Sequence, residues 1–238
     1  MRAVILAGGK GRRLLPYTTV FPKPLMPIGD MPILEVVLRQ LKRHGFDRIT
    51  MAVGHLSELL RAFFKDGKRF GLNIDYSMEE YPLGTAGPLS LISGLDEPFI
   101  VMNGDILTDL DYSNLFRHHR ESGGIATIAT HERSVKIDFG VLETTADGII
   151  HGYTEKPSIQ YRVSMGVYVF DPKVLVHIPR DAYLDFPELV KTLIRNGEKV
   201  FSYPFEGNWL DIGRPDDYEQ AIMEFEKNKE RYLPGGTG

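Results

Sequence analysis

The stretch that decides the fold is Leu6-Ala-Gly-Gly-Lys-Gly-Arg-Arg-Leu14, which Phe21-Pro-Lys-Pro-Leu25 follows shortly afterwards. An apolar run, residues 2–6, leads into it, and three of the four residues after Ala7 are glycines (Gly8, Gly9 and Gly11). Glycines let the backbone turn tightly and point its N–H groups at an anion. Nearby basic side chains add charge, and an arginine can hold a phosphate through two parallel hydrogen bonds. The stretch therefore predicts a buried strand that ends in a phosphate-binding loop.

Two common nucleotide loops do not fit this stretch. A Walker loop needs Gly-x4-Gly-Lys-Ser/Thr, which is absent, and a dinucleotide fingerprint needs a third glycine where Leu14 stands. Taken alone, the glycine pattern also fits a surface turn with solvated basic residues. The loop thus belongs to another class of phosphate binder, or to none.

Short strand patterns alternate with helical patterns through the first half of the chain. Strands are predicted at residues 2–6, 48–53, 73–76 and 99–102, and helices at residues 31–44, 57–65 and 112–121. The first helix places its apolar residues on one face and stops at Gly45. This alternation predicts an α/β fold with a Rossmann-like, mostly parallel mixed sheet and helices on both faces.

Strands dominate beyond residue 123. They are expected at residues 125–130, 140–143, 149–154, 165–170 and 200–203, with helices at residues 187–195 and from Pro215 onward. We predict a single domain, residues 1–233, in which residues 1–123 form a nucleotide-binding half and residues 124–233 add strands that could line a pocket for a second ligand. Residues 234–238 are predicted to be a disordered tail because this glycine-rich end offers nothing to pack.

Composition excludes several classes of function. The chain has 238 residues, a net charge of -4 and no cysteine, so neither a polycationic nucleic-acid binder nor a thiolate or disulfide chemistry fits. No apolar run has the length of a membrane span, and the run after Met1 is too short for a signal peptide. We expect a cytoplasmic protein without a membrane partner.

The stretch from residue 6 to residue 32 resembles the signature of the sugar-1-phosphate nucleotidylyltransferases, also called NDP-sugar pyrophosphorylases. The matching residues are Gly8, Gly9, Gly11, Arg13, Leu14, Pro16, Pro22, Lys23, Pro24, Leu25, Pro27 and Pro32. Further matches follow in the family's order: Leu83-Gly-Thr-Ala-Gly-Pro-Leu, Asn103-Gly-Asp, Phe139-Gly-Val, Glu155-Lys-Pro, Met165-Gly-Val-Tyr and Trp209-Leu-Asp-Ile-Gly-Arg-Pro. The resemblance implies the nucleotide-diphospho-sugar transferase fold. It also implies transfer of a nucleotidyl group from a nucleoside triphosphate to a sugar 1-phosphate.

The resemblance also implies residue roles. It assigns catalysis to Arg13, Lys23, Asp105 and Lys156, and a Mg²⁺ ion to Asp105 and Asp211. Nucleotide binding falls to Leu6, Ala7, Gly8, Gly9, Gly11, Arg12, Glu79, Gly84 and Thr85. Sugar binding falls to Gly140, Glu155, Lys156, Ser164 and Gly166. Spacing alone would leave the two aspartates as solvated or capping residues.

The choice of base and sugar depends on fewer residues. A carboxylate at Glu79 could accept both the N1–H and the amino group of guanine, and residues 83–89 resemble those of mannose- and heptose-1-phosphate guanylyltransferases. We therefore expect GTP and a mannose- or heptose-type sugar 1-phosphate. The alternative is a glucose-1-phosphate thymidylyl-, uridylyl- or cytidylyltransferase, because Ser164 replaces the usual asparagine of the sugar pocket. Arg12 also departs from the family, where a small hydroxyl residue is usual.

Two rival functions stay open. Asp109-Leu110-Asp111 fits the DxD pattern of glycosyltransferases, although it more simply opens a helix. A regulatory subunit that binds a nucleotide sugar without turnover is the non-enzymatic reading. His118 and His119 are read as surface residues and Trp209 as a core residue. The oligomeric state is left open, a homo-oligomer included.

Overall fold

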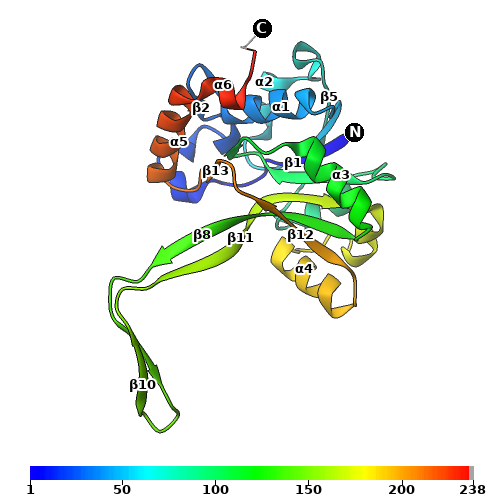
Figure 1. Ribbon diagram of the computed structural model, residues 1–238. Coiled ribbons are helices and arrows are strands. Elements are labelled where there is room, and N and C mark those ends of the chain that lie inside the picture. The colour runs from blue at the N-terminus through cyan, green and yellow to red at the C-terminus, as the bar shows by residue number, and fades with distance from the viewer. Residues whose placement is uncertain (236–238) are drawn as a thin grey trace.

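A seven-stranded sheet forms the centre of the molecule (Figure 1). The structure, a computed structural model, describes residues 1–235. The strand order is β12-β8-β11-β6-β1-β4-β5, and every neighbouring pair is parallel except the two that involve β11. The predicted mostly parallel mixed sheet is therefore confirmed. Its strands are β1 (Arg2–Leu6), β4 (Arg48–Val53), β5 (Asn73–Met78), β6 (Phe99–Asn103), β8 (Ala126–Lys136), β11 (Ser158–Phe170) and β12 (Val200–Phe205).

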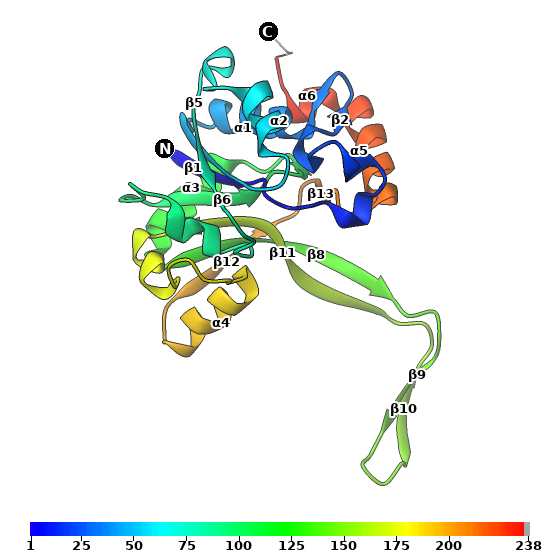
Figure 2. The ribbon, with the colours of Figure 1, turned by 180° about the vertical axis from the view of Figure 1, so that it is seen from behind.

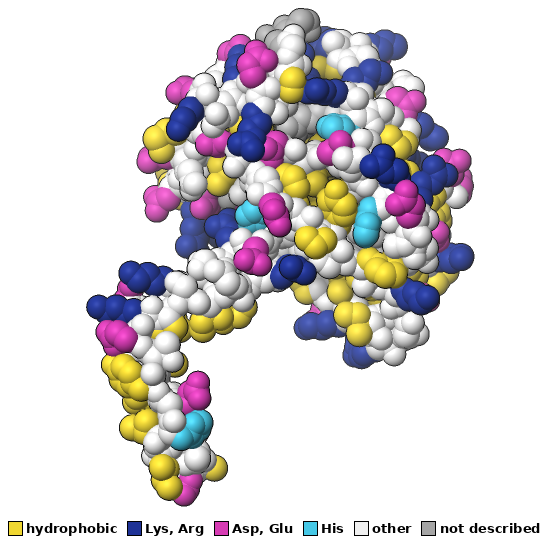
Figure 3. All heavy atoms as spheres, in the orientation of Figure 1, with side chains coloured by type: hydrophobic (Ala, Val, Ile, Leu, Met, Phe, Trp, Pro, Cys, Tyr) yellow, Lys and Arg dark blue, Asp and Glu magenta, His cyan; other side chains and the backbone are white. Residues whose placement is uncertain are grey.

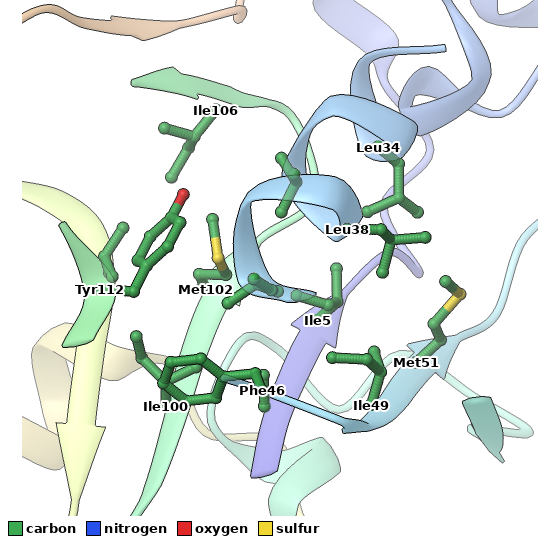
Figure 4. Close-up of a cluster of buried hydrophobic side chains, with 14 of the residues drawn as sticks. Ile5, Leu34, Leu38, Phe46, Ile49, Met51, Ile100, Met102, Ile106 and Tyr112 are labelled. Atoms are coloured by element: carbon green, nitrogen blue, oxygen red, sulfur yellow. The ribbon is translucent and has the colours of Figure 1, made fainter. Parts of the chain in front are cut away.

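Helices cover both faces of this sheet. On one face lie α1 (Ile33–Arg43), α2 (Ser57–Phe64) and α3 (Tyr112–Ser122), and on the other lies α4 (Phe186–Arg195). A hydrophobic core lies between the sheet and the helices on each face, and alternate residues of β1 point into the two cores. Ile5 belongs to the core under α1, and Val4 belongs to the core under α4. Figure 4 shows Leu34 and Leu38 of α1 beside Ile5 and Met102 of the sheet.

A third core packs the C-terminal region against the outer side of α1. It joins α5 (Pro215–Lys227) and α6 (Lys229–Tyr232) to two small antiparallel pairs. These pairs are β2 (Pro27–Ile28) with β3 (Met31–Pro32), and β7 (Ile106–Thr108) with β13 (Trp209–Asp211). The predicted helix from Pro215 onward is confirmed as α5, whose Ala221 and Phe225 are buried in this core. This packing carries β13 to the edge of β7, close to residue 105.

The element boundaries agree with the sequence prediction to within a few residues in the first half. Gly45 does end α1, with a φ of 83° that suits glycine. His119, predicted to lie at the surface, is instead buried, and its Nδ1 lies 2.9 Å from the Thr127 hydroxyl. The prediction was wrong because α3 turns this face toward β8.

The largest difference from the prediction is an arm. The expected strands at residues 125–130 and 165–170 extend into a ribbon of 11 and 13 residues, β8 and β11. Beyond it a second ribbon, β9 (Val141–Thr144) with β10 (Ile150–Thr154), continues away from the body in both views (Figures 1 and 2). The arm is longer than predicted because polar residues beyond 130 still pair in register across the ribbon.

Among the described residues, no helix is both long and apolar enough to cross a membrane. Of the predicted disordered tail, residues 236–238 lie outside the described residues, and Pro234 and Gly235 are exposed.

Candidate functional site

A cleft of about 870 Å³ opens where four parallel strands end. Each strand contributes the residues that follow it: Ala7 and Gly8 after β1, Gly54 after β4, Glu79 after β5, and Asp105 after β6. Open α/β sheets bind ligands at the carboxyl ends of their strands, beside the point where the strand order reverses, which here is β1. The fold therefore places the glycine loop at the position where this architecture binds nucleotides.

The glycine loop forms one wall of the cleft. Gly11 has a φ of 58°, and an added Cβ there would lie 2.8 Å from Thr18 Cγ2, so only glycine fits. The Thr18 hydroxyl donates a hydrogen bond to the Gly11 carbonyl at 2.8 Å, and Leu14 N donates to the same carbonyl at 2.9 Å. These bonds hold the loop, and Arg12 and Arg13 follow it along the wall of the cleft. The wall can accept an anion.

Two carboxylates that are distant in the sequence meet beside this wall. Asp105 follows β6, and the pairing of β13 with β7 sets Asp211 opposite Ile106. A hydrogen bond of 3.3 Å from Ile212 N to the Asp105 carbonyl ties the two segments together. Lys23 forms an ion pair with Asp105 Oδ2, while the other oxygen, Oδ1, is buried without a hydrogen-bond partner.

The environment of this pair suits a divalent cation. Burial, together with the negative charge of Asp105, raises the pKa of Asp211, and Lys23 and Arg13 oppose that rise. A buried carboxylate oxygen without a partner and a second carboxylate of raised pKa both gain from a metal ion. No cluster of three or more acidic or histidine ligands occurs among residues 1–235. Two carboxylates therefore fit an ion such as Mg²⁺, which takes its other ligands from water and phosphate oxygens.

Residues 83–87 form the opposite wall of the cleft. Gly84 has a φ of 80°, and an added Cβ would lie 2.6 Å from the Leu184 carbonyl oxygen. That carbonyl accepts hydrogen bonds from Ala86 N (2.8 Å) and Gly87 N (3.0 Å), and Leu184 N donates back to the Leu83 carbonyl. Close contact between two backbone segments thus holds this wall in place, and the same contact leaves no room for a side chain at residue 84.

Glu79 lies on the floor between the two walls. Its carboxylate accepts a hydrogen bond from Leu83 N at 3.1 Å, and it approaches Gly8 and Gly54 so closely that a Cβ on either would lie within 3 Å of Oε1. Burial raises the pKa of Glu79. The side chain lines the cleft. A half-buried acceptor here can read the edge of a base.

Comparison with known proteins agrees with this geometry. The family described as "Nucleotidyl transferase" matches residues 2–228 of the chain. The chain belongs to the nucleotidyl transferase family. A UTP–glucose-1-phosphate uridylyltransferase of Synechocystis is 38% identical over 93% of the chain and 62% of the relative. A mannose-1-phosphate guanyltransferase beta-B of Xenopus laevis is 33% identical over the whole chain and 70% of the relative. The chain thus spans less than two thirds of the first of these proteins.

Solved structures share the fold of this nucleotidyl transferase. A putative glucose-1-phosphate thymidylyltransferase from Bacillus anthracis superimposes with a TM-score of 0.77 at 22% identity, over 100% of this chain and 97% of the other. HddC from Yersinia pseudotuberculosis gives a TM-score of 0.73 at 25% identity, over 94% and 99% of the two chains. The nucleotide-diphospho-sugar transferase fold implied by the sequence resemblance is confirmed.

The cleft of the nucleotidyl transferase gathers most of the residues singled out in the sequence. Asp211 lies beside the cleft, next to Asp105, and Gly213 contributes to its lining. The predicted nucleotide-binding and catalytic residues that line it are Leu6, Ala7, Gly8, Gly9, Gly11, Arg12, Arg13, Lys23, Glu79, Gly84, Thr85 and Asp105.

The residues expected at the sugar lie elsewhere. Gly140, Glu155 and Lys156 lie on the arm where its two ribbons join, and they do not line the cleft. Glu155 accepts a hydrogen bond from the Tyr153 hydroxyl at 2.7 Å, and its other oxygen lies 3.9 Å from Lys156 Nζ. Both side chains are more than half exposed. In this conformation the arm extends away from the body, so the side chains of Glu155 and Lys156 lie outside the cleft of their own chain.

Ser164 and Gly166 lie at the root of the arm, where the pairing of β11 with β8 shifts register. The Ser164 hydroxyl accepts a hydrogen bond from Gly166 N (3.2 Å) and donates one to the Tyr168 hydroxyl (3.0 Å). Gly166 has a φ of 72°, and a Cβ there would lie 2.7 Å from Asn103 Nδ2. Since Asn103 lines the cleft, Gly166 lies just behind its wall.

Asp185 is a cleft residue that the sequence prediction missed. It precedes α4 like a helix cap, but its side chain makes no cap bond. Instead Oδ1 accepts from Thr85 N (2.9 Å) and Oγ1 (3.1 Å), and Oδ2 accepts from the Tyr183 hydroxyl (2.6 Å). Residues 85 and 185 are a hundred positions apart, so no local pattern could have shown the contact.

The DxD-like pair of the sequence has a structural role. Asp111 caps α3 by accepting a hydrogen bond from Asn114 N at 2.9 Å, as predicted for a residue that opens a helix. Asp109 accepts from Asn208 N at 2.7 Å and forms an ion pair with Arg231. Neither carboxylate lines the cleft, so this pair does not provide the metal site that the glycosyltransferase hypothesis requires. Trp209 is half-buried, and its indole N–H donates to the Met165 carbonyl at 3.1 Å.

Proposed function

We propose that this protein transfers a nucleotidyl group from a nucleoside triphosphate to a sugar 1-phosphate and releases pyrophosphate. An oxygen of the sugar phosphate attacks the α-phosphorus of the triphosphate. The new P–O bond forms as the bond from the α-phosphorus to the bridging oxygen breaks, and the electron pair leaves with pyrophosphate. The sugar phosphate is already an anion at neutral pH, so the reaction needs no activated serine and no covalent intermediate.

The protein's task in this reaction is alignment and charge stabilisation. We assign Arg13 to the departing pyrophosphate and Lys23 to the triphosphate, because both basic side chains line the cleft beside the glycine loop. Lys156 is assigned to the incoming sugar phosphate, with Glu155 hydrogen-bonding sugar hydroxyls. Backbone N–H groups of the glycine loop would bind the phosphates without intervening side chains.

Asp105 and Asp211 are the residues that would hold Mg²⁺. When bound, the ion would neutralise part of the phosphate charge and polarise the α-phosphate. Lys23 is already paired with Asp105, so it links the metal-binding carboxylate to the triphosphate. It thereby offsets part of the negative charge of the two carboxylates before substrate arrives.

We propose GTP as the nucleotide. Support comes from Glu79, whose carboxylate lies on the floor of the cleft and could accept both N–H donors on the edge of guanine. The relative from Xenopus laevis, a mannose-1-phosphate guanyltransferase, is consistent with GTP and a mannose-type sugar. The second candidate is UTP with glucose 1-phosphate, which the 38% identical Synechocystis relative favours.

The observation that carries the proposal is the meeting of Asp105, Asp211 and Lys23 beside the glycine loop. The test is a panel of triphosphates at equal concentration, each offered with mannose, heptose and glucose 1-phosphates and Mg²⁺, with pyrophosphate release as readout. We expect the fastest release with GTP. A clear preference for UTP or dTTP would overturn the base, and no release from any pair would overturn the reaction. Asp105→Asn, expected to lower turnover by about a hundredfold or more, excludes a contaminating activity.

A further inference from the structure

The arm carries Glu155 and Lys156 but leaves them outside the cleft of its own chain. Its two ribbons are each amphipathic. In the proximal ribbon, formed by the outer parts of β8 and β11, Val135 pairs with Ile159, and Tyr161 lies two residues further along on the same face. The other face of this ribbon holds only polar and charged residues. In the distal ribbon, formed by β9 and β10, Leu142 pairs with Tyr153, so both side chains lie on one face.

These apolar faces are exposed to water. The exposed fractions are 50% for Val135, 51% for Tyr161, 50% for Leu142 and 64% for Tyr153. Figure 3 shows hydrophobic side chains gathered along the arm, apart from the body of the molecule. A two-stranded ribbon is marginally stable in water, so a face of this kind needs a cover.

The body of the same chain meets this face near the root of the arm, where Arg133 Cζ lies 5.0 Å from the centroid of the Trp209 ring, but it leaves the apolar side chains exposed. The β8–β11 ladder runs from Ala126 and Phe170 in the central sheet to Lys136 and Ser158 at the end of the proximal ribbon. At its root, β11 also pairs with β6 and β8 pairs with β12. Bringing Lys156 to the cleft of its own chain would require this paired ribbon to bend back or open. A second copy can meet the arm with every one of these pairs intact.

We propose that the arm docks on a second copy of this chain and that Lys156 of each copy completes the cleft of the other. This inference depends on the proposed function, because it assigns Lys156 to the sugar phosphate. A reciprocal exchange about a two-fold axis uses the same surface twice and completes two clefts. Covering the apolar faces of both arms removes on the order of 1,000 Å² of surface from water, which is about the minimum for a biological interface before the partner's own surface is counted.

Mixing two inactive variants tests this arrangement. Lys156→Ala has an intact cleft and a defective arm, whereas Arg13→Ala has a defective cleft and an intact arm. In a mixed dimer one cleft receives a wild-type arm, so an equimolar mixture, exchanged to equilibrium, should recover about a quarter of the wild-type rate. No recovery in a mixture shown by mass to contain mixed dimers would overturn the proposal, because it would mean that the arm closes on its own chain.

The oligomeric state gives a readout that does not depend on activity. Light scattering should find the wild type as a dimer and Tyr153→Asp as a monomer of unchanged circular dichroism. The control is Val176→Asp, which changes an 82% exposed apolar residue outside the arm and should stay dimeric. A monomeric wild type, or a Tyr153→Asp dimer, would overturn the arm exchange and leave the proposed function standing. A dimer without pyrophosphate release would instead overturn the function.

Discussion

Gly84→Ala should damage both stability and nucleotide binding. The new Cβ would lie 2.6 Å from the Leu184 carbonyl oxygen and 2.9 Å from Asp185 Oδ1, distances that real Cβ atoms do not adopt. Residues 83–87 would have to move, and the hydrogen bonds from Ala86 N and Gly87 N to Leu184 would lengthen. Each is worth about 1 kcal/mol. The positive φ adds about 1 kcal/mol for a non-glycine residue.

We therefore expect Gly84→Ala to lower the free energy of unfolding by about 3 kcal/mol. Displacement of this wall should also raise the KM for the triphosphate by about tenfold, which corresponds to about 1.4 kcal/mol of binding. Urea denaturation measures the first quantity, and initial rates of pyrophosphate release against triphosphate concentration measure the second.

Gly123→Ala is the matched control. Gly123 also has a positive φ (64°), but it follows α3 and an added Cβ there would meet no atom within 4 Å. It should cost about 1 kcal/mol, the strain alone, and leave KM unchanged. If both variants lost the same stability and Gly84→Ala kept the wild-type KM, close contact with residue 184 would not position this wall.

Three further outcomes follow from the site. Asp211→Asn should reduce turnover by about a hundredfold and abolish the Mg²⁺-dependent rise in Tm, while its Tm in EDTA should exceed that of the wild type. Because the pKa of Asp211 is raised in the folded state, the ionised carboxylate destabilises the wild type, and the higher Tm of Asp211→Asn should be fully present at neutral pH. The difference in Tm should disappear as the pH falls toward 3.8, the usual pKa of an aspartate; a lower Tm of Asp211→Asn in EDTA at pH 7 would contradict this explanation. Glu79→Gln should reduce the preference for GTP over UTP by about tenfold, measured as the ratio of kcat/KM values, and an unchanged ratio would remove Glu79 from base reading. Asp185→Asn should raise the KM for the triphosphate with little change in kcat, since Asp185 anchors Thr85; a fall in kcat alone would place it elsewhere in the mechanism.

The cleft was the most predictable part of the site because its signals are local. A strand, three glycines and two arginines stand within twelve residues, and each has a physical reason to be there. Asp185 was unpredictable for the opposite reason, since its partner Thr85 comes from another part of the chain. His119 was misjudged because a helical pattern does not say which neighbour covers a polar residue; here β8 covers it and Thr127 supplies the hydrogen bond.

The arm shows where periodicity stops being informative. Alternation predicted strands around residues 125–130 and 165–170, but it could not say whether their polar extensions pair with one another or turn into loops. Pairing depends on long-range register, which a local pattern does not contain. The position of Lys156 relative to the cleft depends on that register.

By itself the sequence determined the class of fold, the order of strands and helices, and a glycine turn able to bind phosphate. It could do so because backbone freedom and hydrophobic period are properties of neighbouring residues. Only the tertiary structure decided that Asp105 and Asp211 meet, that Glu79 lies on the floor of the cleft, and that Lys156 stands away from it. Those contacts join segments up to about a hundred residues apart, and they exist only once the sheet is assembled.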